Sequence, residues 1–184
     1  MIPLHFEKLS RYDRNAEPCM VAVPFPEGEL PAGAPVAVLD GDRAVPTQAR
    51  ATAAWPDGSV KWLLVHFLAD LPGNAGKSLS LQPGGTAPAP AAPVTVEPDG
   101  GGTVLRTGDL RVALAGPGEA GLFRGASLGA LAFGPGEIIG PALTDAEGQS
   151  WVAEVGAEGW EVIEAGPVRA VLQARGKHRG EGLF

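Results

Sequence analysis

Several features that would assign a chain to a common class of protein are scarce in this 184-residue sequence. Cys19 is the single cysteine, so no disulfide can form within the chain. No run approaches the roughly 20 apolar residues of a membrane-spanning helix. The N-terminal segment Met1 to Glu7 contains a proline and a charge where a signal peptide needs a continuous apolar run. We therefore expect a cytoplasmic protein without membrane contact, unless a leader has been removed.

Basic residues are also few. Lys and Arg number 14 against 21 Asp and Glu, and the formal net charge is -7. Phosphate backbones are bound by clustered Lys and Arg, and the sequence has no such cluster, so we expect no nucleic-acid partner. The same charge argues, more weakly, against tight binding of a polyanionic glycan by this chain alone.

Helical periodicity is missing, whereas turn residues are abundant. The 27 glycines and 18 prolines make up about a quarter of the chain, against a usual share of about 12%. Short alternating runs lie between these turn residues, and this pattern predicts an all-β fold. Residues 84–93 are rich in Ala, Pro and Gly and can bury little, which is typical of a linker. We expect two β domains, 1–83 and 94–184, joined by this linker, and no helix longer than about ten residues.

The segment from Trp55 to Val65 is the most informative stretch. Pro56-Asp57-Gly58 has the residues of a tight turn, in which glycine takes a positive φ. The residues that follow are mostly aliphatic or aromatic, as in a strand buried on both faces. We therefore expect a central core strand with Trp62 and Val65 inaccessible to solvent. On that reading Trp62→Ala costs about 3 to 5 kcal/mol, and Gly58→Val is poorly tolerated.

Three segments, in this order and spacing, resemble a known domain. Val23 to Leu30, Ala44 to Gln48 and Trp55 to Val65 are similar to the N-terminal RIFT-barrel domain of the exo-rhamnogalacturonan lyase and YetA-like proteins. Glu164 to Val171, followed by Gly176-Lys177-His178, resembles the start of the β-sandwich that follows that barrel. The resemblance implies a small RIFT-type β-barrel followed by an incomplete antiparallel β-sandwich, with the sandwich continuing past Phe184 in the family.

The resemblance carries no catalytic residue to this chain. Lyases of this kind cleave next to a uronic acid by β-elimination, which needs a base, a cation or acid for the enolate and a proton for the leaving oxygen. The family places these groups largely in a downstream (α/α) toroid, and this sequence has no helical segment of that type. We therefore expect no catalytic residues, no metal and no cofactor in this chain.

Other candidate sites have ordinary structural explanations. The three histidines, His5, His66 and His178, lack metal-ligand spacing, and His66 falls in the expected core strand. Glu161 and Glu164 are expected to be surface glutamates of a strand.

Three residues around the turn are the best candidates for carbohydrate contact. Trp55 offers a flat apolar ring that can stack on a sugar, and Lys61 can neutralise a uronate carboxylate. Asp57 completes this candidate site, although a turn aspartate is usually structural.

Three functions fit the sequence. The first is a non-catalytic N-terminal β module of a polysaccharide-lyase-like protein, which supports a catalytic domain or partner chain. The second is a stand-alone carbohydrate-binding or protein-interaction module. The third, a flavin- or nucleotide-binding barrel, rests on analogy between folds alone. An open aromatic surface favours glycan binding, whereas a flat apolar face favours docking to another domain.

Overall fold

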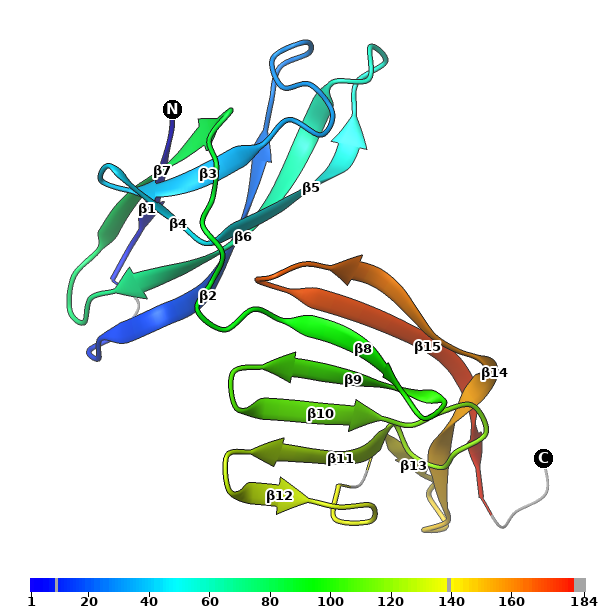
Figure 1. Ribbon diagram of the computed structural model, residues 1–184. Helices are drawn as coiled ribbons and strands as arrows, with labels where there is room; N and C mark the ends of the chain where they lie inside the picture. Colours follow the sequence, from blue (N-terminus) through cyan, green and yellow to red (C-terminus); the bar gives the residue numbers. More distant parts are fainter. Residues whose placement is uncertain (9, 139, 181–184) are drawn as a thin grey trace. The chain divides into compact units, whose positions relative to one another are not determined.

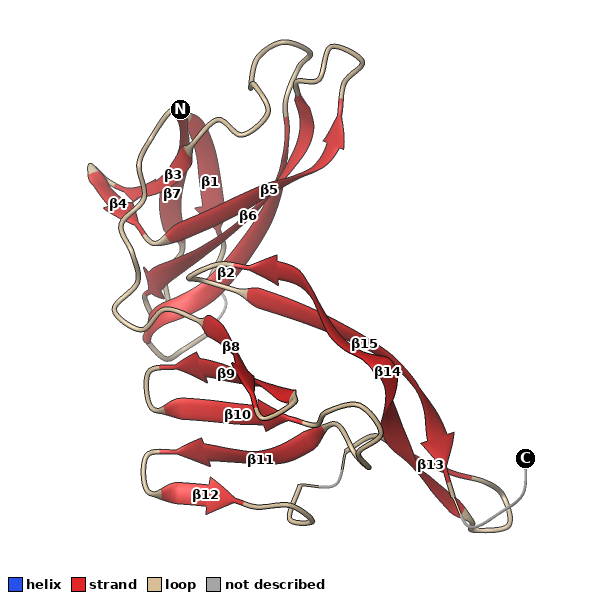
Figure 2. Ribbon diagram, turned by 45° about the vertical axis from the view of Figure 1, so that its right-hand side comes forward, coloured by secondary structure: helices blue, strands red, loops and turns tan. Residues whose placement is uncertain are grey.

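The computed structural model describes residues 1–8, 10–138 and 140–180. Fifteen strands and no helix are found in this part of the chain, so the expected all-β fold is confirmed (Figure 2). All strand pairs are antiparallel. The chain divides into two compact units, the first comprising Met1–Ala91 and the second beginning at Ala92. The division lies in the Ala-, Pro- and Gly-rich segment, where residues 84–94 form no strand.

Unit 1 contains seven strands in two sheets (Figure 1). They are β1 (Ile2–Phe6), β2 (Arg14–Pro24), β3 (Val36–Asp40), β4 (Arg43–Val45), β5 (Thr47–Ala54), β6 (Val60–Leu71) and β7 (Lys77–Pro83). One sheet has the order β1-β7-β3-β4 and the other β2-β6-β5. Pro46 alone separates β4 from β5, and its carbonyl accepts a hydrogen bond from the Leu68 amide at 3.0 Å, so the two sheets are joined at this corner.

A single apolar core fills unit 1. Its fully buried side chains include Val38 and Leu81 from the four-stranded sheet and Val65 and Phe67 from β6. The ring of Phe67 meets Phe6 edge to face, with 5.9 Å between the ring centroids. β6 lies between β2 and β5, which confirms the expected central position of this strand and the burial of Val65.

The expectation that Trp62 lies in the core is wrong. Its side chain is 41% exposed, whereas its neighbour Leu63 is only 5% exposed. Side chains alternate between the two faces of a strand, and Leu63, Val65 and Phe67 all point into the core. Trp62 therefore points away from the core, because the sheet β2-β6-β5 packs on the core with one face and leaves part of the other face open.

Unit 2 contains eight strands, also in two sheets. They are β8 (Thr95–Asp99), β9 (Gly102–Thr107), β10 (Leu110–Leu114), β11 (Phe123–Leu128), β12 (Leu131–Phe133), β13 (Ala142–Thr144), β14 (Ser150–Ala165) and β15 (Ala170–Arg179). The five-stranded sheet has the order β12-β11-β10-β9-β8, and the three-stranded sheet has the order β13-β14-β15.

The two sheets of unit 2 meet through the segment between β10 and β11. Gly118 and Gly121 donate backbone hydrogen bonds to the carbonyls of Val155 and Ala153 in β14, at 2.8 and 2.6 Å. The Trp160 indole donates to the Ala115 carbonyl at 2.7 Å. Buried apolar residues gather here: Val104, Ala113, Leu114, Ala115, Ala153 and Val155. This end of the five-stranded sheet is therefore anchored on β14.

Candidate functional site

The turn before β6 has the geometry that its sequence predicts. The Trp55 amide donates to the Ser59 carbonyl at 2.8 Å, and the Gly58 amide donates back to the Trp55 carbonyl at 2.9 Å. Gly58 has a φ of 85°, a conformation that residues with a Cβ rarely adopt. Asp57 accepts hydrogen bonds at Oδ1 from the Ser59 amide at 2.8 Å and from the Ser59 hydroxyl at 2.6 Å. The chain reverses within these residues and enters β6.

A second loop, residues 25–30, is held against this turn. The amide of Gly28 donates to the Ser59 hydroxyl oxygen at 2.8 Å, and the Val60 amide donates to the Leu30 carbonyl at 2.8 Å. The Phe25 amide donates to the Lys61 carbonyl at 3.0 Å. Two segments that are about 30 residues apart in the sequence thus form one hydrogen-bonded end of unit 1. Phe25 and Leu30 are each 2% exposed, which fastens this loop to the core.

Trp55, Asp57 and Lys61, the three residues expected at a carbohydrate site, all lie at this end. The Trp55 indole N–H donates to the Phe25 carbonyl at 2.9 Å. The Lys61 Nζ lies 4.3 Å from the centroid of the Trp55 ring, so the ammonium covers one face of the indole in a cation–π contact. These two contacts occupy the indole N–H of Trp55 and one face of its ring, and a sugar could otherwise use both.

Asp57 is likewise engaged within the turn. Hydrogen bonds from Ser59 stabilise the charged carboxylate and lower the pKa of Asp57 below its ordinary value. A carboxyl group with a lowered pKa is a weak base at neutral pH, because a general base works best with a pKa near the working pH. The chemistry of this group therefore favours a structural role in the turn.

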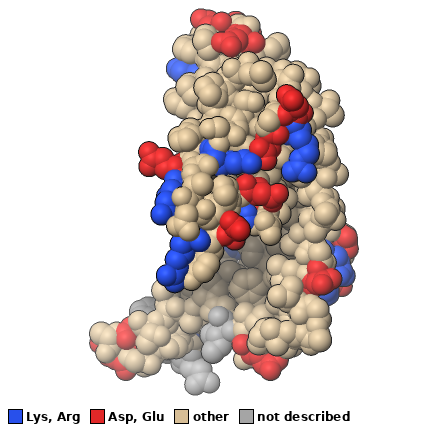
Figure 3. Space-filling view, turned by 90° about the vertical axis from the view of Figure 1, so that its left-hand side faces the viewer, with Lys and Arg blue, Asp and Glu red and all other residues tan. Residues whose placement is uncertain are grey.

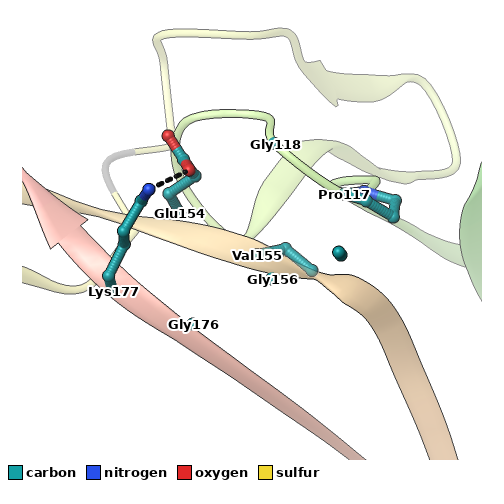
Figure 4. Close-up of a pocket in the computed structure, with 8 residues that line it drawn as sticks. Pro117, Gly118, Glu154, Val155, Gly156, Gly176 and Lys177 are labelled. Carbon is teal, nitrogen blue, oxygen red and sulfur yellow. Dashed lines mark ion pairs between the residues drawn. The ribbon is translucent and has the colours of Figure 1, made fainter.

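Unit 2 contains an ionic cluster that sequence reasoning missed. Glu154 on β14 is 8% exposed and pairs with two cations from β15. Its Oε2 lies 2.7 Å from the Arg179 Nε, and its Oε1 lies 3.4 Å from the Lys177 Nζ. Figure 4 shows the Glu154 and Lys177 side chains turned toward each other above the strands. Because Glu154 and Lys177 are direct cross-strand partners, the cluster ties the end of β15 to β14.

A pocket of about 530 Å³ lies beside this cluster, with Pro117, Gly118, Val155 and Gly156 among its lining residues (Figure 4). Gly176 on β15 also lines it, and a Cβ there would overlap the Glu154 carbonyl oxygen. Glycine is therefore required at this point for close packing of the two strands. The sequence indicates this site only weakly, because the family resemblance is the one feature that draws attention to Gly176-Lys177-His178.

A second ion pair in unit 2 stabilises the loop that leads into β11. The Arg124 guanidinium donates to Glu119 at 2.7 Å from both Nε and Nη2, and the Gly116 amide donates to the same carboxylate at 2.9 Å. These bonds lower the pKa of Glu119 to about 2, with the Arg124 hydrogen bonds as the largest cause. Arg124 also donates to the Asp99 carbonyl, which fixes the β8–β9 turn.

The described residues offer little else that resembles a catalytic or metal site. No group of three His, Cys, Asp or Glu side chains could hold a metal ion in this part of the chain. Cys19 is buried, and burial raises the pKa of its thiol, which makes it a poor nucleophile. On the face shown in Figure 3, basic and acidic residues lie beside one another and do not form separate areas of one sign. None of the described elements is a helix long and apolar enough to cross a membrane.

Comparison with known proteins identifies the kind of domain that lies within unit 1. Residues 6–79 match the family model described as the PcRGLX-like N-terminal RIFT barrel domain. No curated protein matches the chain. The matched residues run from the end of β1 into β7 and include the Trp55 turn and all of β6. Unit 1 of this chain is therefore a RIFT barrel domain similar to the N-terminal domain of a rhamnogalacturonan-lyase-like family.

Proposed function

We propose that this chain is a non-catalytic β module of a polysaccharide-lyase-like protein, and that it supports a catalytic domain acting on rhamnogalacturonan or another uronate glycan. The match of unit 1 to a RIFT barrel domain of that family supports the glycan connection. The contacts of Trp55, Asp57 and Lys61 support a structural role, because these side chains stabilise the turn and the loop beside it.

One face of the five-stranded sheet carries the proposal. The cross-strand partners that share this face, here called the apolar face, hold no ionisable side chain: Val96, Leu105, Thr107, Leu110, Val112, Ala126, Leu128, Leu131 and Phe133. The opposite face carries Glu97, Arg106 and Arg111, with ion pairs such as Arg106–Glu97 at 3.5 Å.

Large side chains of the apolar face are open to solvent. Leu128 and Leu131, which are direct cross-strand partners, are 57% and 56% exposed, and Phe133 is 43% exposed. Antiparallel sheets commonly pack their apolar face on a core and leave the charged face in water. An uncharged face of this kind with several exposed large side chains is typical of an interaction surface. It fits a role in which this sheet packs against another domain.

A protein-interaction module, in which the apolar face binds a separate partner chain, is the second candidate function. The same exposed side chains favour it, because an interface core is also uncharged. The two candidates differ in the identity of the partner. The test must therefore use a lyase catalytic domain as the binding partner.

The test compares two neighbouring residues on opposite faces of β11. Leu128→Glu places a charge on the apolar face, whereas the control Ser127→Glu places it opposite Arg111 on the charged face. An (α/α) toroid domain of a lyase of the resembled family, produced as a separate chain, serves as the probe in sedimentation-velocity experiments. We expect the wild-type chain and Ser127→Glu to bind it, and Leu128→Glu to bind at least about tenfold more weakly, because a buried unpaired charge is costly.

Activity is measured in the same preparations. The purified chain, incubated with rhamnogalacturonan, should give no rise in the ultraviolet absorbance of unsaturated uronate. A rise that disappears in Lys61→Ala would contradict the non-catalytic role. Absence of binding to the toroid domain, or equal binding by all three chains, would contradict the support role.

A further inference from the structure

The outward face of the sheet β2-β6-β5 in unit 1 carries an exposed tryptophan on a rigid strand. Trp62 faces Pro24 of β2 and Ala53 of β5 across the sheet. The next residue pairs on the same face are Ala22 with Leu64 and Leu64 with Arg50. Strand β6 is paired on both sides, so the indole is carried by backbone that is already fixed before any ligand arrives.

Trp62 and Trp55 differ in what remains available for a ligand. The Trp55 N–H donates to the Phe25 carbonyl, and Lys61 covers one face of the Trp55 ring. Trp62 is 41% exposed, and no described residue accepts a hydrogen bond from its indole N–H. Trp62 therefore combines an indole N–H that no described residue uses with a side chain that is partly open to solvent.

The neighbours of Trp62 on this face are small. Ala22 and Pro24 are exposed and Ala53 is half-buried, so the indole is surrounded by short apolar side chains. Arg50 is exposed on the same face, opposite Leu64, which is the next outward residue of β6 after Trp62. An exposed indole among small apolar neighbours, with its own N–H as a donor, suits a sugar ring, which has an apolar C–H face and a rim of hydroxyl groups.

We propose that Trp62 is the stacking platform of a saccharide-binding site on the outward face of β2-β6-β5. The C–H face of a pyranose ring packs on the indole, and the Trp62 N–H donates to an oxygen at the rim of the sugar. This inference goes beyond the proposed function, because a module that only supports another domain needs no contact with glycan of its own.

The site is tested by native electrophoresis of the whole chain in gels that contain polygalacturonate, neutral galactan or no polysaccharide. Retardation by one of the polysaccharides is expected for the wild-type chain. Trp62→Ala should reduce the apparent affinity by at least about tenfold, because the ring that covers the C–H face of the sugar is lost. Trp62→Phe should retain part of the binding, because the ring remains while the N–H donor is lost.

The matched control is Tyr12→Ala in unit 1, which removes an aromatic ring that is 62% exposed but lies in the bend before β2, outside the sheet β2-β6-β5. It should bind like the wild-type chain. Far-ultraviolet circular dichroism establishes that each variant is folded. Equal retardation of the Trp62→Ala and wild-type chains, or no retardation of the wild-type chain by either polysaccharide, would overturn the proposal. Neither result bears on docking of the toroid domain, which is measured at the apolar face of unit 2.

Discussion

At the scale of single residues, two aromatic side chains of β6 that the sequence alone does not distinguish differ strongly in burial. Phe67 is fully buried and contacts Phe6, whereas Trp62, five residues earlier, is 41% exposed. We predict that Phe67→Ala lowers the free energy of unfolding by about 3 to 5 kcal/mol, since it leaves a cavity in the core. Trp62→Ala should cost less than Phe67→Ala, because 41% of Trp62 is already in solvent and its removal leaves no cavity in the core. Urea denaturation followed by circular dichroism measures both values, and a larger loss for Trp62→Ala than for Phe67→Ala would contradict the assignment of faces.

At the scale of elements, the turn from Trp55 to Ser59 decides how β5 leads into β6. Gly58 has a φ of 85°, and a Cβ added there would meet no atom within 4 Å. A substitution therefore tests backbone conformation without steric overlap. Gly58→Val should lower stability by about 1 to 2 kcal/mol, because β-branched residues resist positive φ. Gly58→Asn should cost less, because asparagine tolerates this region. Thermal unfolding of the two variants gives the comparison, and equal melting temperatures would show that φ at this position is not what limits the substitution.

At the scale of the whole molecule, unit 1 contains a complete core of its own. The cluster of buried residues that includes Val38, Val65, Phe67 and Leu81 is drawn from unit 1 alone. We predict that residues 1–91, produced alone, fold and unfold in one cooperative transition, because no part of this core depends on unit 2. The midpoint in urea, followed by the fluorescence of Trp55 and Trp62 in the fragment, should lie close to the urea concentration at which the β6 amides of the full chain lose protection from hydrogen exchange. A fragment that is unfolded in buffer would contradict the independence of unit 1.

Much of the local structure can be derived from the sequence because it depends on neighbours in the chain. The turn at Pro56-Asp57-Gly58 and the positive φ of Gly58 follow from the residues themselves. The all-β fold follows from the many turn residues and the absence of helical periodicity. Trp55, Asp57 and Lys61 lie at one end of unit 1 for the same reason, since all three belong to one turn and the start of one strand.

Which face of a strand is buried is decided only by what packs against it. An apolar strand such as β6 reads the same whether one or both faces are covered, so the sequence placed Trp62 in the core and Trp55 at the surface. In the structure Trp62 is exposed, because the core lies on the other face of its sheet. The Trp55 indole instead donates to the Phe25 carbonyl and is covered on one face by Lys61. The ion cluster of Glu154 with Lys177 and Arg179 was equally hidden, because strands β14 and β15 bring these charges together from positions more than 20 residues apart. The sequence by itself thus determined the strands and turns of this protein, whereas the tertiary structure alone decided which of its side chains face solvent and which partners they meet.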